Sequence, residues 1–137
     1  MKASMKFLFL LAPLLVAAGP VHAAEDYEVV QIWACEMDDA TTEAQLEAVA
    51  AQYLKAVRGV DGGAEASMKV FFPAVVNNTG QIDFYFVLNA KTFADWGKIW
   101  DATVEGTALA AAEDSGKGKF VCPDSMLWEA HPVAPAP

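Results

Sequence analysis

The chain has 137 residues, 55% of them hydrophobic and 20% charged, and a formal net charge of −9 at pH 7. This length suits one domain with a hydrophobic core. An acidic surface repels phosphate backbones and anionic lipid headgroups, so the composition argues against nucleic-acid binding and against attachment to a membrane surface. The simplest role of the charge is solubility.

The N-terminus has the three parts of a secretory signal peptide. Lys2 and Lys6 form a short basic start, residues 7–18 form an apolar run, and Ala23 is the small residue at which a signal peptidase cuts. The apolar run is shorter than the about 20 residues of a membrane-spanning helix, which argues against the alternative of a permanent anchor. We therefore predict a signal peptide over residues 1–23 and export, either to a bacterial periplasm or out of the cell. Without its two lysines the mature chain carries seven basic and 18 acidic residues, a net charge of −11.

Cys35 and Cys122 are the two cysteines of the chain, and both belong to the exported part. In an oxidising compartment such a pair most simply forms a structural disulfide. The alternative, a redox-active thiol, lacks the Cys-x-x-Cys spacing that is typical of it. One disulfide and one tail histidine, His131, do not supply the ligands of a Cys/His metal site, so we expect no metal and no cofactor.

The predicted elements follow the order strand, helix, strand, strand, helix, strand. Thr42 and Gln45 form a capping box at the start of the first helix, and Thr92 and Asp95 give the second a similar start. Pro73 indicates an edge position or a bulge in the second strand. By periodicity, the strands cover residues 27–35, 66–76, 81–88 and 120–129, with a turn over 77–80, and the helices cover 42–59 and 92–105, with a further helical turn or two before 113.

This order of elements is that of a ferredoxin-like sandwich, an α+β fold in which an antiparallel sheet carries both helices on one face. In that topology the last strand lies beside the first, which brings Cys35 next to Cys122. Directly opposed residues have Cα atoms about 4.5–5.5 Å apart, within the range of a disulfide. We expect one such domain over residues 24–130, followed by a Pro/Ala-rich tail over 131–137.

The two faces of the sheet are assigned by period-two alternation, with Cys35 set opposite Cys122. The expected helix-covered face consists of Val30, Ile32, Ala34, Ile82, Phe84, Phe86, Leu88 and Leu127. The expected open face consists of Tyr27, Gln31, Trp33, Lys69, Phe71, Asp83, Tyr85 and Trp128. A solvated sheet face is normally polar, so this aromatic face should be covered.

A ligand or a second subunit could cover the open face. Aromatic walls with few polar groups are typical of ligand pockets, whereas dimer interfaces also favour Trp and Tyr. The candidate residues for either role are Gln31, Trp33, Lys69, Asp83, Tyr85 and Trp128.

The apolar strand over residues 84–88, followed by Thr92-Phe93-Ala94-Asp95-Trp96, resembles the dimeric α+β barrel superfamily, which includes the antibiotic-biosynthesis monooxygenase-like domains. The resemblance implies a homodimer whose two sheets enclose a lumen, used by some members for small hydrophobic substrates. This chain differs in being exported and closed by a disulfide. It also lacks an internal histidine, so the haem-binding branch is not expected.

No catalytic residue is assigned, because nucleophilic triads need a base and neither histidine is placed to act as one. Three classes of function remain open. The first is a non-catalytic exported domain that self-associates and binds a small apolar ligand. The second is a cofactor-independent monooxygenase-like enzyme, and the third is a structural interaction module of the cell envelope.

Overall fold

The computed structural model describes residues 27–74, 80, 82–104 and 106–133. The predicted signal peptide, most of the predicted 77–80 turn and the end of the predicted tail lie outside these residues. The elements are β1 (Glu28–Met37), α1 (Glu43–Val57), β2 (Ser67–Phe71), β3 (Phe84–Ala90), α2 (Phe93–Asp101), α3 (Ala108–Asp114) and β4 (Phe120–Ala130).

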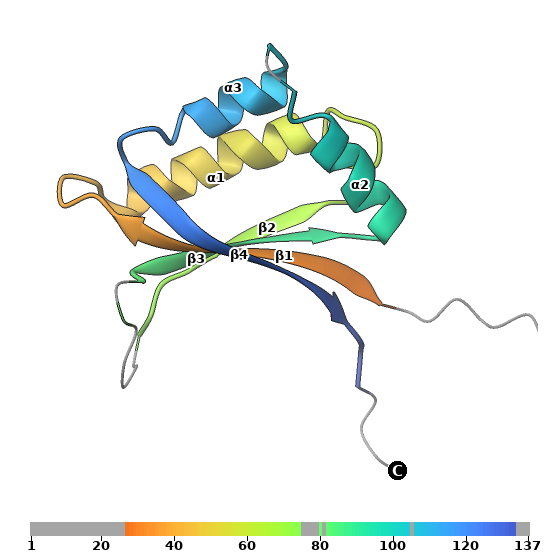
Figure 1. Ribbon diagram of the computed structural model, residues 1–137, viewed down its shortest axis with the longest axis horizontal. Helices are drawn as coiled ribbons and strands as arrows, with labels where there is room; N and C mark the ends of the chain where they lie inside the picture. Colours follow the sequence, from red (N-terminus) through yellow and green to blue (C-terminus); the bar gives the residue numbers. More distant parts are fainter. Residues whose placement is uncertain (1–26, 75–79, 81, 105, 134–137) are drawn as a thin grey trace, which may run out of the picture.

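The four strands form one antiparallel sheet in the order β2-β3-β1-β4. The three helices all lie on one side of this sheet, and the other side is open (Figure 1). This is the ferredoxin-like α+β sandwich that the sequence predicted. The edge strand β2 is shorter than predicted: it ends at Phe71, two residues before Pro73, whose missing N–H does not suit a ladder.

The predicted capping box starts α1. The Thr42 hydroxyl accepts a hydrogen bond from the backbone N–H of Gln45 at 3.3 Å, and the Gln45 side chain accepts one from the N–H of Thr42 at 2.8 Å. These bonds satisfy amide groups that the first turn leaves unpaired. The local sequence therefore fixes where the helix begins.

The second helical region was predicted as one helix over 92–105 with a further turn or two before 113. The structure instead has two separate helices, α2 and α3. Thr92 caps α2 by accepting a hydrogen bond from the Asp95 N–H at 3.1 Å. The chain then turns through Gly106, whose φ of 87° lies in the left-handed region that favours glycine. Thr107 caps α3 by accepting from the N–H of Ala110 at 3.1 Å. Because a new N-cap at Thr107 follows this glycine, the region forms two helices instead of one.

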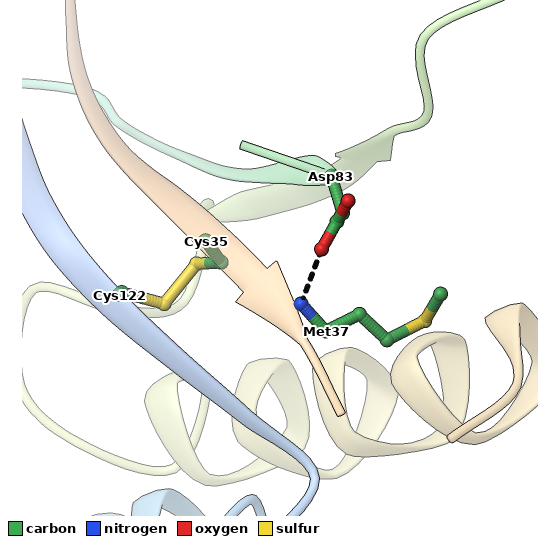
Figure 2. Close-up of a disulfide and its surroundings, with 4 residues drawn as sticks. All are labelled: Cys35, Met37, Asp83 and Cys122. Carbon is green, nitrogen blue, oxygen red and sulfur yellow. Dashed lines mark hydrogen bonds between the residues drawn. A yellow bond between two sulfur atoms is a disulfide. The ribbon is translucent and has the colours of Figure 1, made fainter. Parts of the chain in front are cut away.

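The predicted disulfide between Cys35 and Cys122 is present and joins β1 to β4 (Figure 2). Their Cα atoms lie 4.0 Å apart. Ala34 pairs with Asp124 while Glu36 pairs with Val121, so Cys35 faces two residues of β4, and this extra residue makes a β-bulge. The second of them is Pro123, which an edge strand or bulge tolerates because no ladder bond needs its N–H.

The face assignment of β1 from sequence was wrong. Trp33 pairs with Phe86 and Gln31 pairs with Leu88, and paired residues share a face. The helix-covered face of β1 therefore carries Val29, Gln31, Trp33 and Cys35, whereas Val30, Ile32 and Ala34 lie on the open face. Both sides of this central strand are apolar enough that its alternation does not identify the inner one.

Tyr27 was also misassigned, since it packs on the helix side with its ring centroid 6.0 Å from that of Phe93. For the assigned residues that lie within β2, β3 and β4, the register agrees with the predicted faces, whereas Ile82 and Asp83 precede β3 and have no place in the register. Leu127 shares the face of Gln31, while Trp128 shares that of Val30. Likewise, Lys69 and Phe71 pair with Val87 and Tyr85 on the open face.

The core lies between the sheet and the helices. Its largest fully buried side chains are Phe84, Leu46, Leu88, Leu109, Val29, Val57 and Cys35. Across the described ranges, no helix combines the length and the apolar character that crossing a membrane requires.

Candidate functional site

A cavity of about 210 Å³ lies between the sheet and the three helices. Five aromatic side chains from five different elements line it: Trp33 of β1, Tyr53 of α1, Phe86 of β3, Trp100 of α2 and Phe120 of β4. Met68 of β2 adds a flexible apolar wall. The cavity thus draws on residues from every strand of the sheet.

The aromatic rings hold one another in place. The Trp33 ring meets Tyr53 edge to face with centroids 6.2 Å apart, and Phe86 meets Phe120 at 5.1 Å. Such tilted pairs contribute about 0.5–1.5 kcal/mol beyond the area that they bury. The walls are therefore preorganised by packing within the subunit.

Two alanines explain why the helices leave space above the sheet. Ala50 of α1 is 7% exposed and Ala112 of α3 is 2% exposed, and both line the cavity. A larger residue at either position would extend into the space that the aromatic side chains enclose. The cavity exists because small residues on the helices face large ones on the sheet.

The entrance is formed by residues that are both lining and exposed, Trp100 and Glu113. Trp100 is 51% exposed and stacks on Trp96, one helical turn earlier, with centroids 5.6 Å apart. Glu113 lies in the last turn of α3. A ligand entering here would pass an indole on one side and a carboxylate on the other.

Tyr53 and Glu113 form a polar pair in this apolar setting. The Tyr53 hydroxyl faces the Glu113 carboxylate, close enough for a hydrogen bond between them to contribute to the pKa of each group. Burial raises the pKa of Tyr53, and the nearby charge of Glu113 and this hydrogen bond raise it further. The pKa of Glu113 is also raised, first by the partial burial of its carboxyl group at the entrance and then by the negative charge of Asp114, while the hydrogen bond from Tyr53 acts in the opposite direction. The pair can offer a ligand a hydrogen-bond acceptor and a negative charge.

The disulfide borders the same cavity, since Cys122 is part of its lining. Two residues earlier on β4, Phe120 packs against Phe84 at 5.7 Å and against Phe86 at 5.1 Å. The bond from Cys35 thereby holds the start of an otherwise exposed edge strand against the cavity.

The six candidate residues predicted from sequence do not share one face. Trp33 lines the cavity and Gln31 is buried beside it on the helix-covered face, so their predicted place on the open face was wrong. Of the other four, Lys69, Tyr85 and Trp128 lie on the open face as predicted. Asp83 precedes β3. Their predicted role in binding or dimerisation stays a prediction.

Asp83 has a structural contact near the disulfide (Figure 2). Its carboxylate accepts a hydrogen bond from the Met37 N–H at 2.7 Å, and its own N–H donates to the Cys35 carbonyl at 2.9 Å. Asp83 thus joins the start of β3 to the end of β1.

Sequence reasoning did not find the cavity. In the sequence, Tyr53 and Trp100 follow the apolar periodicity of their helices, a pattern that indicates packing and not a site. Glu113 belongs to a short alanine-rich helix with no motif. Within the described residues, no group of three or more His, Cys, Asp or Glu side chains could hold a metal ion.

No family model matches the chain, and no curated protein matches it. Among solved structures, it is similar to a dimeric ferredoxin-like protein of unknown function from Thermobifida fusca, with 16% identity, a TM-score of 0.45 and coverage of 77% of this chain and 91% of that one. A hypothetical Arabidopsis thaliana protein gives 10% identity, a TM-score of 0.48 and coverage of 83% and 94%. A dimeric ferredoxin-like protein of unknown function from Bacteroides fragilis gives 10% identity, a TM-score of 0.40 and coverage of 76% of this chain and 95% of that one. At these scores the assignment of the fold depends on the strand order above.

Proposed function

We propose that this protein is an exported binding domain that takes up a small, mainly apolar molecule in the cavity between sheet and helices. The observation that supports this most directly is the aromatic-walled space with one polar pair at its entrance. Ligand sites typically combine apolar walls with a few placed polar groups. Pockets for drug-sized ligands have volumes of about 300–1,000 Å³, so a cavity of about 210 Å³ suits a smaller molecule.

Packing energetics support the same proposal. Protein interiors are filled about as densely as organic crystals, and unfilled space lowers stability. Here the space lies among preorganised rings and opens to solvent beside Trp100. A ligand would recover the contacts that the wall residues lack.

The test is a pair of substitutions at neighbouring positions of α3. Ala112→Leu fills part of the cavity, whereas Ala111→Leu adds the same side chain at an exposed position. Binding of small aromatic probes to the mature protein is measured by ligand-observed NMR and calorimetry, with circular dichroism to check the fold. We expect Ala112→Leu to weaken binding at least about tenfold and Ala111→Leu to leave it unchanged. Equal affinity of the folded variants would place the ligand elsewhere.

A second proposal concerns the open sheet face, which we propose is covered by a second copy of the chain. Phe71 and Trp128 on this face are 50% and 55% exposed, and large apolar patches are uncommon on monomers. Lys69 on edge strand β2 and Asp124 on edge strand β4 lie at opposite margins of the face. A two-fold axis along the strands would set Lys69 of each copy near Asp124 of the other.

The catalytic alternative, a cofactor-independent monooxygenase-like activity, would use the same cavity. Among the described lining residues, Tyr53 and Glu113 are the ones that carry a hydroxyl or a carboxylate. Incubation of the protein with a bound aromatic probe in air, followed by mass spectrometry, separates binding from turnover. An oxidised product that disappears in a Tyr53→Phe variant would favour the enzyme.

A further inference from the structure

The charge around the cavity has one sign. Of the described residues that line it, Glu113 is the only charged one, and none is Lys, Arg or His. Asp114 follows directly, but its charge is paired with that of Lys117, so the negative charge that a ligand meets at the entrance is that of Glu113. An anionic ligand would meet repulsion here without a compensating partner.

The basic residues nearest in sequence are engaged elsewhere. Lys117 pairs with Asp114 at 2.6 Å, and Lys119 donates to the backbone carbonyl of Ser115. Neither lines the cavity. The Glu113 carboxylate thus faces the space with the Tyr53 hydroxyl as its hydrogen-bond donor and no cationic partner among the lining residues.

The walls also favour positive charge. The faces of Trp, Tyr and Phe rings attract cations, with Trp the strongest, and the attraction grows when the cation is removed from water. Trp33 and Trp100 line the cavity together with three further rings. Aromatic surfaces beside one carboxylate are the combination that recognises an ammonium group on an apolar body.

Building on the proposed ligand site, we infer that the ligand is a small organic cation: an amine or ammonium compound whose charged group meets Glu113 and whose apolar body lies among the rings. In this arrangement the Tyr53 hydroxyl would act as a positioning group, since it lies beside the Glu113 carboxylate and can donate a hydrogen bond to it. The raised pKa of Glu113 agrees with a carboxylate that lacks a cation in the free protein. A strongly acidic chain also steers cations toward its surface.

Three probes of matched shape test this inference: 2-phenylethylamine, 2-phenylethanol and 3-phenylpropionate. Their affinities for the mature protein are measured by calorimetry at pH 7 and low salt. We expect 2-phenylethylamine to bind at least about tenfold more tightly than 2-phenylethanol, because its ammonium group adds a Coulomb attraction to the Glu113 carboxylate that the neutral alcohol lacks. The anionic probe, 3-phenylpropionate, should bind most weakly.

Glu113→Gln should remove the preference for the amine, because it lowers the affinity for 2-phenylethylamine much more than the affinity for 2-phenylethanol. Glu47→Gln is the matched control, since it makes the same charge change at an exposed position of α1 outside the cavity lining. Equal binding of amine and alcohol, or tighter binding of the carboxylate, would overturn the cationic ligand while the cavity remains a binding site. Binding of none of the three would count against the proposed binding function itself.

Discussion

Cys35 and Cys122 are bonded at the one place where the register between β1 and β4 shifts. Elsewhere on β4 most residues are exposed, so helix packing contributes little to holding this edge strand. The disulfide sits next to the cavity, and Phe120 just before it packs on the two core phenylalanines of β3. Loss of the bond should therefore affect both stability and the site.

The first prediction is that a Cys35→Ala/Cys122→Ala variant loses about 2–5 kcal/mol of unfolding free energy, the usual range for a native disulfide in a small domain. Urea denaturation of the mature protein measures it. A reducing agent should lower the stability of the parent protein by a similar amount and leave that of the variant unchanged. If oxidised and reduced parent proteins unfold at the same urea concentration, the bond does not stabilise the domain.

The order of elements and the disulfide were predictable from sequence because their causes are local or topological. Each helix start is determined by residues close together in sequence: Thr42 with Gln45, and Thr92 with Asp95. Once the element order places the last strand beside the first, the two cysteines must meet. The division of the second helical region depended on a backbone conformation at Gly106 that periodicity does not reveal.

The cavity was not predictable because it arises between elements. In the sequence, Ala50 and Ala112 are ordinary helix residues. Their small side chains leave a cavity only because α1 and α3 pack over Trp33 and Phe86. The faces of β1 were assigned wrongly for a related reason. Gln31 looks like a solvent-facing residue, yet it is 4% exposed beneath the helices.

The second prediction concerns Tyr53→Phe, which removes the hydroxyl that donates to Glu113. Because this hydrogen bond favours the charged carboxylate, its loss should raise the pKa of Glu113 further. Carbon-13 NMR of the Glu113 carboxyl through a pH titration measures the shift. Tyr85→Phe is the control, since it removes the same atom on the open face. An unchanged Glu113 pKa in Tyr53→Phe would show that the hydroxyl does not reach the carboxylate in solution.

The third prediction is the pH dependence of stability caused by Glu113. Its pKa is raised in the folded state, mainly by burial, so the folded protein binds this proton more tightly than the unfolded chain does. Its contribution therefore favours folding at acidic pH and is lost as the pH rises through the folded pKa.

Removing the charge isolates this contribution from that of the other acids. The unfolding free energy of Glu113→Gln minus that of the parent protein should become more positive between about pH 4 and pH 7. Thermal or urea unfolding at a series of pH values gives the difference. A difference that falls as the pH rises would mean that the folded environment favours the charged carboxylate, contrary to the raised pKa.

The fourth prediction tests the open sheet face with two tryptophans of similar exposure on opposite sides of the molecule. Trp128 is 55% exposed and shares the open face with Val30, whereas Trp100 is 51% exposed and lies on α2. Because both side chains already contact water, replacing either with Glu should leave the fold intact. In a dimer formed through the open face, however, Trp128→Glu would bury an unpaired charge, which costs several kcal/mol.

Light scattering and sedimentation then distinguish the two variants, with circular dichroism to confirm that each is folded. We expect the parent protein and Trp100→Glu to behave as dimers and Trp128→Glu to behave as a monomer. Tyr85→Glu, on the same face as Trp128, should reproduce the effect. Should Trp128→Glu remain dimeric, the second copy must bind elsewhere; one further exposed apolar position on β4 is Val121, which is 63% exposed. A monomeric parent protein would instead leave the aromatic residues of this face without the partner proposed for them.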